Sequence, residues 1–212
     1  MSKKHFELIL GNKLFKEHMC SDVGLLFNKL GLEGQSPKVM VITCADSRVC
    51  PNFITNSRPG DLFVVRNVAN LVPNFTAADV VSNSVFAAIQ FAVNYLNIMD
   101  IVIMGHSKCG GIAAVVDKMQ STDKNDFICK WLKSSGKDLE GLIESHKHFG
   151  ASKYECCEKL SIVKSIENCR KIPFVADLVK DSKLNIHGWY FDIEKALLSV
   201  WDEKENRFIE NI

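Results

Sequence analysis

The 212-residue chain lacks an excess of charge of either sign. Its 26 lysines and arginines are balanced by 25 aspartates and glutamates, which leaves a formal net charge of +1. Nucleic acids and anionic membrane surfaces are attracted by extended fields of positive charge, and a balanced chain has none. We therefore expect neither nucleic acid nor a membrane among its partners.

Long apolar runs and export signals are also missing. No run approaches the roughly 18 consecutive apolar residues that a membrane-spanning helix needs. The opening residues 1–7 lack the apolar stretch and small-residue cleavage site of a secreted chain, so we expect a cytoplasmic protein. The eight cysteines are then expected to be thiols or metal ligands rather than disulfides.

Internal repeats and low-complexity linkers are absent, and 47% of the residues are hydrophobic. This composition predicts one domain over residues 1–212 with a substantial core. Residues 1–34 form a distinct opening segment, with apolar positions at helical spacing between residues 5 and 30. We expect Gly11 and Gly24 to divide this arm into shorter helices. Its apolar face has to pack either on its own domain or on a second subunit.

The rest of the chain alternates short apolar runs with helix-like stretches. Runs at residues 38–44, 61–66 and 100–106 are apolar on both faces, which is typical of parallel strands covered on both sides. Further strands are expected over residues 184–192 and 196–201. Helices are expected over residues 77–96, 126–148 and 154–170, and another helix is expected to start within residues 110–117. The alternation predicts an α/β fold, with a central, mostly parallel β-sheet flanked by helices, an N-terminal helical arm and a helical C-terminal half.

Two of the predicted strands end in residues that bind metals. The first ends at Cys44, and the third ends at His106, with Cys109 three residues later. Ligands of such folds bind at the carboxyl ends of the strands, so these side chains converge if the two strands are neighbours. Two thiolates and an imidazole suit Zn²⁺, and three protein ligands leave the fourth position open, as in catalytic sites.

Two other readings of these residues remain open. A buried cysteine at a strand end is often only a small apolar residue. A structural zinc site would recruit a fourth ligand, for which Cys50, His146 and His148 are the candidates. A noncatalytic zinc-binding or redox-sensing protein would have such a ligand in place of water.

Asp46 and Arg48 follow the first predicted ligand at a spacing of two. At this spacing they can form a charge-assisted pair in which the carboxylate stays ionised and acts only as an acceptor. It would then accept a hydrogen bond from a metal-bound hydroxide. The alternative is an ordinary surface salt bridge.

The pattern Cys-x-Asp-x-Arg from Cys44, followed by His-x-x-Cys-Gly-Gly from His106, resembles the signature of the β-class carbonic anhydrases. Residues 59–70, 87–93 and 184–192 also fit that family, and the resemblance extends over residues 5–208. It implies a zinc lyase, with one Zn²⁺ per chain, that reversibly hydrates CO₂ to bicarbonate and a proton. A zinc-bound hydroxide would attack CO₂, oriented by the Asp46–Arg48 dyad. In some members the aspartate instead becomes a fourth zinc ligand in a closed state.

Within the family, the chain resembles the plant-like, non-allosteric subgroup. Gln35, Phe63 and Val68 match substrate-pocket residues of that subgroup, and the N–H of Gly110 would hold an oxygen of bicarbonate. Phe91 stands where the subgroup usually has tyrosine. The other subgroup has a tryptophan at the position of Val41, three residues before the first cysteine, and is inhibited by bicarbonate at a noncatalytic site.

The resemblance also implies a homo-oligomer, namely a dimer, tetramer or octamer. Its smallest unit would be a homodimer in which the 1–34 arm packs on the partner subunit and the partner lines part of each pocket. An alternative function is hydration of a related substrate, COS or CS₂, at the same site. The sequence barely distinguishes this alternative from CO₂ hydration.

Overall fold

The computed structural model describes residues 2–17, 22–75, 83–117, 126–136 and 149–210. Their centre is a six-stranded sheet in the order β2-β1-β3-β4-β5-β6. The parallel strands are β1 (Val39–Cys44), β2 (Leu62–Asn67), β3 (Asp100–His106) and β4 (Asn185–Asp192). The antiparallel strands β5 (Leu197–Asp202) and β6 (Arg207–Glu210) extend one edge. The expected α/β fold with a mostly parallel sheet is confirmed.

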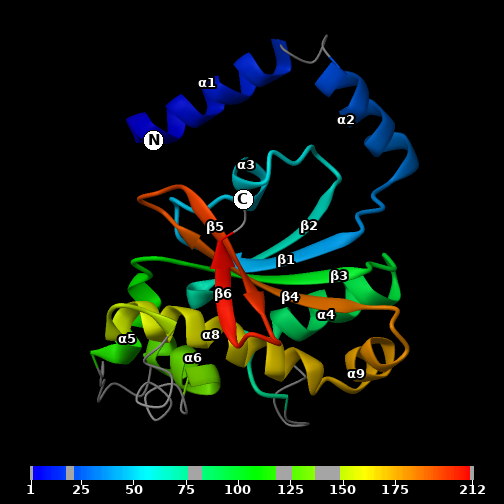
Figure 1. The fold of residues 1–212 in the computed structure, drawn as a ribbon. Helices are drawn as coiled ribbons and strands as arrows, with labels where there is room; N and C mark the ends of the chain where they lie inside the picture. Colours follow the sequence, from blue (N-terminus) through cyan, green and yellow to red (C-terminus); the bar gives the residue numbers. More distant parts are fainter. Residues whose placement is uncertain (1, 18–21, 76–82, 118–125, 137–148, 211–212) are drawn as a thin grey trace.

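One face of the sheet carries most of the helices (Figure 1). These are α4 (Ser84–Asn94), α5 (Gly110–Val116), α6 (Phe127–Gly136), α8 (Lys153–Arg170) and α9 (Pro173–Lys180). The short helix α3 (Pro51–Ile54) lies on the other face. The parts of the predicted helices that fall on residues 77–82 and 137–148 lie outside the described residues.

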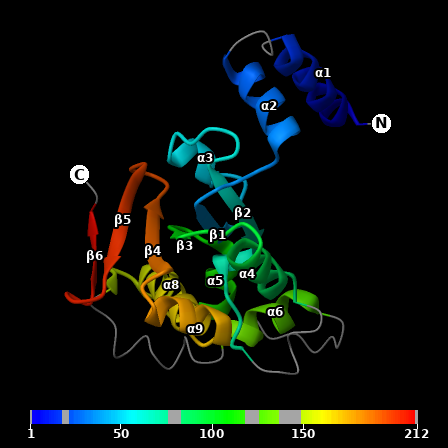
Figure 2. The ribbon, with the colours of Figure 1, turned by 90° about the vertical axis from the view of Figure 1, so that its right-hand side faces the viewer.

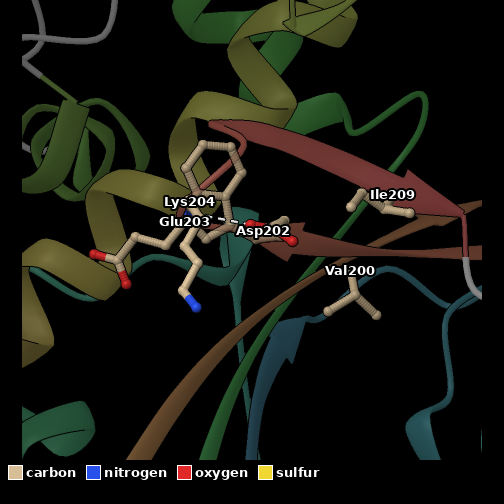
Figure 3. Close-up of a pocket in the computed structure, with 6 residues that line it drawn as sticks. Val200, Asp202, Glu203, Lys204 and Ile209 are labelled. Atoms are coloured by element: carbon tan, nitrogen blue, oxygen red, sulfur yellow. Dashed lines mark hydrogen bonds between the residues drawn. The ribbon is translucent and has the colours of Figure 1, made fainter.

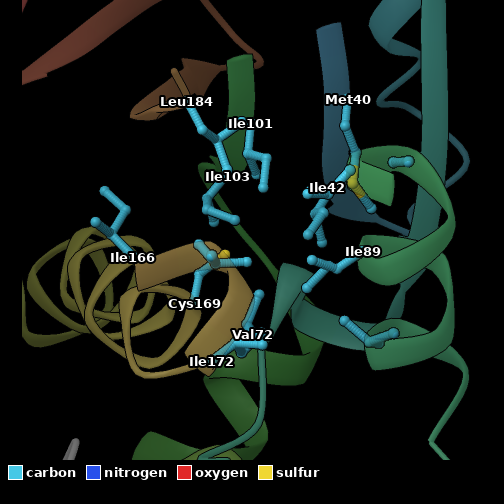
Figure 4. Close-up of a cluster of buried hydrophobic side chains, with 14 of the residues drawn as sticks. Met40, Ile42, Val72, Ile89, Ile101, Ile103, Ile166, Cys169, Ile172 and Leu184 are labelled. Carbon is cyan, nitrogen blue, oxygen red and sulfur yellow. The ribbon is translucent and has the colours of Figure 1, made fainter. Parts of the chain in front are cut away.

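The main core lies between the sheet and this helical layer. Figure 4 shows Ile101 and Ile103 of β3 facing Ile166 of α8, with Met40 and Ile42 of β1 beside helix α4. The four isoleucines and Met40 are at most 3% exposed. Because apolar residues on the same face of a strand recur every second position, these runs fill one layer with branched side chains. The packing holds β1 and β3 side by side, which positions the residues that follow them.

Two of these helices begin at a polar residue whose side chain caps the first turn. Asn83 caps α4, its Oδ1 accepting from the N–H of Val85 at 3.0 Å. Ser152 caps α8 and accepts from the N–H of Glu155 at 3.2 Å. The Glu155 carboxylate reaches back to the N–H of Ala151 at 2.8 Å, in the manner of a capping box.

The N-terminal arm consists of α1 (Lys3–Glu17) and α2 (Asp22–Glu33). The expectation that Gly11 and Gly24 divide it is wrong, because α1 continues through Gly11 and α2 contains Gly24. A glycine inside a helix costs only about 1 kcal/mol, which the surrounding helix formers offset. Both helices stand away from the sheet (Figure 2), and α1 has no buried residue. No helix within the described ranges is long and apolar enough to cross a membrane.

Candidate metal centre

The carboxyl ends of β1 and β3 bring the three predicted ligands together. The strands pair in parallel with Thr43 opposite Met104, so Cys44 and His106 end at the same edge of the sheet. Cys109 follows as the residue that precedes the first turn of α5. The ligand atoms of the three side chains all lie within 4.8 Å of one another, and the two Sγ atoms are 3.9 Å apart.

The imidazole of His106 has one ring nitrogen that is available to bind a cation. Its Nδ1 lies 2.9 Å from the carbonyl oxygen of Ser107, which can only accept, so Nδ1 carries the proton. The other nitrogen, Nε2, is therefore unprotonated and has a lone pair. This atom is buried and has no hydrogen-bond partner. An unsatisfied buried acceptor costs about 1–3 kcal/mol, and a metal ion between the three side chains would remove that cost.

The sulfurs of Cys44 and Cys109 form a hydrogen bond with each other. Their hydrogen bond lowers the pKa of Cys44, and the same bond together with burial raises the pKa of Cys109. Backbone N–H groups of Asp46 and Ala69 also favour the thiolate of Cys44. A divalent cation would allow both sulfurs to ionise. Two sulfurs and one imidazole nitrogen fit Zn²⁺ with an open fourth position.

Among the candidates for a fourth ligand, Cys50 does not join this cluster. Within the described part of the chain, the cluster contains Cys44, His106 and Cys109 alone. Cys50 is the residue that precedes α3 and is only partly buried. His146 and His148 lie outside the described residues.

Asp46 and Arg48 form a bidentate pair beside the cluster. Arg48 donates from Nε and Nη2 to the two carboxylate oxygens at 2.9 and 2.8 Å, and its backbone N–H donates to Oδ1 at 2.9 Å. These bonds hold the pKa of Asp46 well below its usual range. Its Oδ2 lies 4.0 Å from Nε2 of His106, so an ionised acceptor stands next to the candidate metal position.

Two residues that the sequence analysis did not single out support this edge. Arg66 of β2 donates to the carbonyl oxygens of Cys44, Asp46 and Val49 at 3.0, 2.6 and 2.7 Å. Glu158 of α8 accepts from the backbone N–H of Cys109 at 3.0 Å. Burial raises the pKa of Glu158, while the hydrogen bond from Cys109 opposes this rise. No spacing relative to the ligands signals either residue, because both lie on other elements.

The turn after β2 closes the other side of the site. This short 3₁₀ turn, η2 (Val68–Asn70), contains Ala69 at φ 67°, a left-handed conformation that is rare for residues with a side chain. Trp131 of α6 donates to the carbonyl oxygen of Val68 at 2.8 Å. Gly111 of α5 lies against the turn, where a Cβ would come within 2.9 Å of Val68 Cγ1 and 3.0 Å of Ala69 Cβ.

The predicted substrate residues fall into two groups. Val68 packs against the cluster that contains Cys44 and Cys109, and Gly110 begins α5 directly after Cys109. The other group lies elsewhere. Phe63 pairs with Met40, four positions before Cys44, which is about 13 Å along the strand.

Phe91 belongs to that second group. Its ring lies 5.9 Å from the ring of Phe63, measured between centroids. Gln35 is exposed and precedes β1, at the opposite end of that strand from Cys44. A single chain therefore does not place Gln35, Phe63 or Phe91 beside its own metal ligands.

A separate hollow lies on the β5–β6 hairpin. It has a volume of about 560 Å³ and is lined by Val200, Trp201, Asp202, Glu203, Lys204 and Ile209. In Figure 3, Val200 and Asp202 lie on β5 and Ile209 lies on β6, while Glu203 and Lys204 follow β5 in the turn of the hairpin. None of the lining residues belongs to the cysteine–histidine cluster, so the chemistry of the molecule centres on the carboxyl edge of the parallel strands.

An α/β sheet that gathers two thiols, an imidazole and an arginine-bound carboxylate at this edge defines a candidate metal-dependent enzyme. The family described as Carbonic anhydrase matches residues 39–198. A carbonic anhydrase of Pseudomonas aeruginosa is 32% identical over 185 residues, which cover 87% of this chain and 81% of that protein. Beta carbonic anhydrase 5, chloroplastic, of Arabidopsis thaliana is 38% identical over 173 residues, which cover 80% of this chain.

Solved structures agree with these relatives. The β-carbonic anhydrase CcaA has a TM-score of 0.90 and 30% identity, over 100% of this chain and 93% of that one. One of two tetrameric β-carbonic anhydrases of Sordaria macrospora has a TM-score of 0.78 and 25% identity, over 94% and 97% of the two chains. The chain belongs to the β-class carbonic anhydrase family. Its matched region spans 56% and 57% of the lengths of two Arabidopsis relatives.

Proposed function

We propose that the chain catalyses the reversible hydration of CO₂ to bicarbonate and a proton, with one Zn²⁺ held by Cys44, His106 and Cys109. The observation that carries this proposal is the buried, partnerless Nε2 of His106, which faces two thiols beside an arginine-bound carboxylate. When bound, Zn²⁺ supplies acidity, since it lowers the pKa of a coordinated water from far above the physiological range to about 7.

The chain's own residues then bind and orient the reactants. Asp46 stays ionised through its bonds to Arg48, so it accepts a hydrogen bond from the attacking water and turns a lone pair of that water toward CO₂. Val68 offers an apolar wall, which suits an uncharged substrate with weak hydrogen-bonding capacity. The N–H of Gly110 donates to an oxygen of the bicarbonate product.

A second copy of the chain completes each site. Gln35, Phe63 and Phe91 lie toward the far end of the sheet from the metal ligands of the same chain, so they would serve the site of a partner. Phe6, Leu8 and other apolar residues of α1 are exposed, which supports an arm over residues 1–34 that packs on that partner. The active form is a homodimer or a higher homo-oligomer of this single-domain chain, residues 1–212.

The chain acts in the cytoplasm and belongs to the plant-like subgroup. The location rests on the expectation that the eight cysteines stay thiols or metal ligands in a reducing compartment. Val41 is fully buried in β1, where it offers no polar atom for a regulatory bicarbonate. Cell fractionation tests the location. Titration of the activity with bicarbonate tests the subgroup. We expect only the inhibition that a product causes at the active site, with no additional inhibition from a second bicarbonate site.

The proposed activity is tested by stopped-flow CO₂ hydration with the zinc-loaded protein between about pH 6.5 and 9. We expect fast turnover that rises with pH, and kcat/KM about 100-fold lower in Asp46→Asn, because an amide is a weaker and differently directed acceptor. Asp177→Asn, on α9, is the matched control and retains wild-type turnover. A zinc-loaded wild type that turned over COS but not CO₂ would contradict the proposal.

A further inference from the structure

The peptide bond between Lys108 and Cys109 links the proposed dyad to a buried carboxylate on another helix. On one side, its carbonyl oxygen accepts from Nη2 of Arg48 at 3.0 Å. On the other side, its N–H donates to Oε1 of Glu158 at 3.0 Å. Both contacts are made by one planar unit, so a rotation that breaks one also disturbs the other.

The conformation of this peptide needs such support. Lys108 has φ 57°, in the left-handed region that residues with a Cβ rarely occupy. Strained backbone of this kind persists where its surroundings over-determine it. Arg48 is largely exposed, with 47% of its side-chain surface accessible. The more rigid of the two contacts is therefore the one made by Glu158.

Glu158 is itself fixed from several directions. It is 4% exposed, although it belongs to one of the residue types that are almost never fully buried. Its Oε2 accepts from the hydroxyl of Tyr190 on β4 at 2.9 Å, which leaves Oε1 for the N–H of Cys109. The Nζ of Lys159 lies 4.9 Å from the centroid of the Tyr190 ring. The proposed chemistry of the site does not use this carboxylate, so its burial requires another reason.

We propose that Glu158 is a positioning residue for the Asp46–Arg48 dyad and acts on it through the Lys108–Cys109 peptide. By accepting the N–H of Cys109, Glu158 turns the carbonyl of Lys108 toward Arg48. That carbonyl keeps the guanidinium aligned on the carboxylate of Asp46. The inference rests on the proposed function of the dyad. Without this alignment, Asp46 is free to approach the metal position, since its Oδ2 is already 4.0 Å from Nε2 of His106.

The test compares two substitutions of Glu158. Glu158→Met keeps the length of the side chain but has no acceptor for the N–H of Cys109. Its kcat falls about 10- to 100-fold, as for other groups that orient metal ligands, with KM changed less than about twofold. Glu158→Gln retains an oxygen acceptor, and its amide N–H₂ can donate to the oxygen of Tyr190. Its kcat stays within about threefold of the wild type.

A matched control lies one helical turn earlier. Glu155 is also a carboxylate of α8 that accepts from a backbone N–H, but its partner is Ala151, whereas the N–H of Cys109 donates to Glu158. Glu155→Met leaves kcat unchanged. Thermal unfolding of all the variants identifies any that fail to fold, and Glu158→Gln keeps the comparison valid if Glu158→Met is unstable.

A second readout does not depend on turnover. In the Co²⁺-substituted protein, the visible absorption bands report the fourth ligand, and a carboxylate in place of water changes them. We expect changed bands in Glu158→Met and wild-type bands in Glu158→Gln and Glu155→Met. A double-mutant cycle with Arg48→Ala tests the route, because Glu158→Met costs little further activity once Arg48 is absent.

The inference is wrong if Glu158→Met keeps wild-type kcat and cobalt bands, if Glu158→Gln loses as much as Glu158→Met, or if the losses from Glu158→Met and Arg48→Ala simply multiply. Failure of the proposed function would look different. In that case the wild-type protein itself would bind zinc without hydrating CO₂.

Discussion

At the scale of single residues, burial determines which cysteines can react. Cys169 of α8 is fully buried in the main core, and burial raises its pKa to about 12. Cys44 and Cys109 are also buried, but they face a histidine and backbone N–H groups that stabilise negative charge. The same side chain is thus an apolar filler in one place and a candidate metal ligand in the other.

The raised pKa of Cys169 predicts a loss of stability at alkaline pH. An unfolded thiol ionises near pH 8.5, whereas the folded thiol stays neutral to about pH 12. The contribution of Cys169 is therefore complete below about pH 8.5 and is lost as the pH rises from there toward 12. Between pH 8 and 10, the loss of this contribution lowers the free energy of unfolding by about 2 kcal/mol.

Urea unfolding of the wild type and Cys169→Ala at the two pH values measures this effect. We expect the wild type to lose about 2 kcal/mol more than the variant between pH 8 and 10. Equal losses in the two proteins would show that Cys169 already ionises in the folded state.

At the scale of elements, the metal edge depends on close contact between α5 and the turn η2. Gly111 has no Cβ, so the first turn of α5 lies directly against Val68 and Ala69. Ala69 in turn directs its N–H toward the sulfur of Cys44. This contact therefore couples the position of Cys44 to the position of α5, the helix that follows Cys109.

Gly111→Ala is predicted to disturb that contact. The new Cβ would lie 2.9–3.0 Å from Val68 Cγ1 and Ala69 Cβ, so α5 or the turn has to move. We expect a loss of about 1–3 kcal/mol in the free energy of unfolding. We also expect weaker zinc retention against a chelator. Gly110→Ala is the control, because no heavy atom outside its chain neighbours and its own helix backbone lies within 4 Å of the added Cβ. Unchanged behaviour of Gly111→Ala would contradict the coupling.

At the scale of the whole molecule, the fold leaves apolar surface on an arm that its own domain does not cover. Helix α1 has no buried residue, and Phe6, Leu14 and Phe15 are 50%, 58% and 44% exposed. Apolar side chains in this number on one segment mark an interaction surface. In the proposed function a second copy of the chain covers that surface.

Removal of residues 1–34 is therefore predicted to change the oligomer and the activity together. Sedimentation equilibrium should show a homodimer or larger oligomer for the full chain and a smaller species for the truncated one. Turnover should fall with dimer dissociation, since each site would lose residues supplied by the partner. A truncated chain that keeps both the full mass of the oligomer and wild-type turnover would contradict the role of the arm.

The sequence predicted the parallel strands within a residue or two. For β1 and β3 the reason is a continuous apolar run that is almost wholly buried, whereas β2 is only half-buried. The sequence missed β6, since Arg207–Glu210 is a short edge strand with two charged ends and no such run. It also wrongly expected Gly11 and Gly24 to divide helices of the arm, because glycine proved compatible with helix at both positions. Local patterns are reliable where burial enforces them and weak at exposed edges.

The sequence by itself determined the candidate ligands, the Asp46–Arg48 pair and the family, because those patterns depend on residue types at short spacings. Only the tertiary structure decided that β1 lies beside β3, that Glu158 meets the backbone of Cys109, and that Phe63 and Phe91 lie far from the ligands of their own chain. The physical reason is that strand pairing and helix packing join residues distant in the chain. Such contacts are set by the shape and burial of the whole core, which no local spacing records.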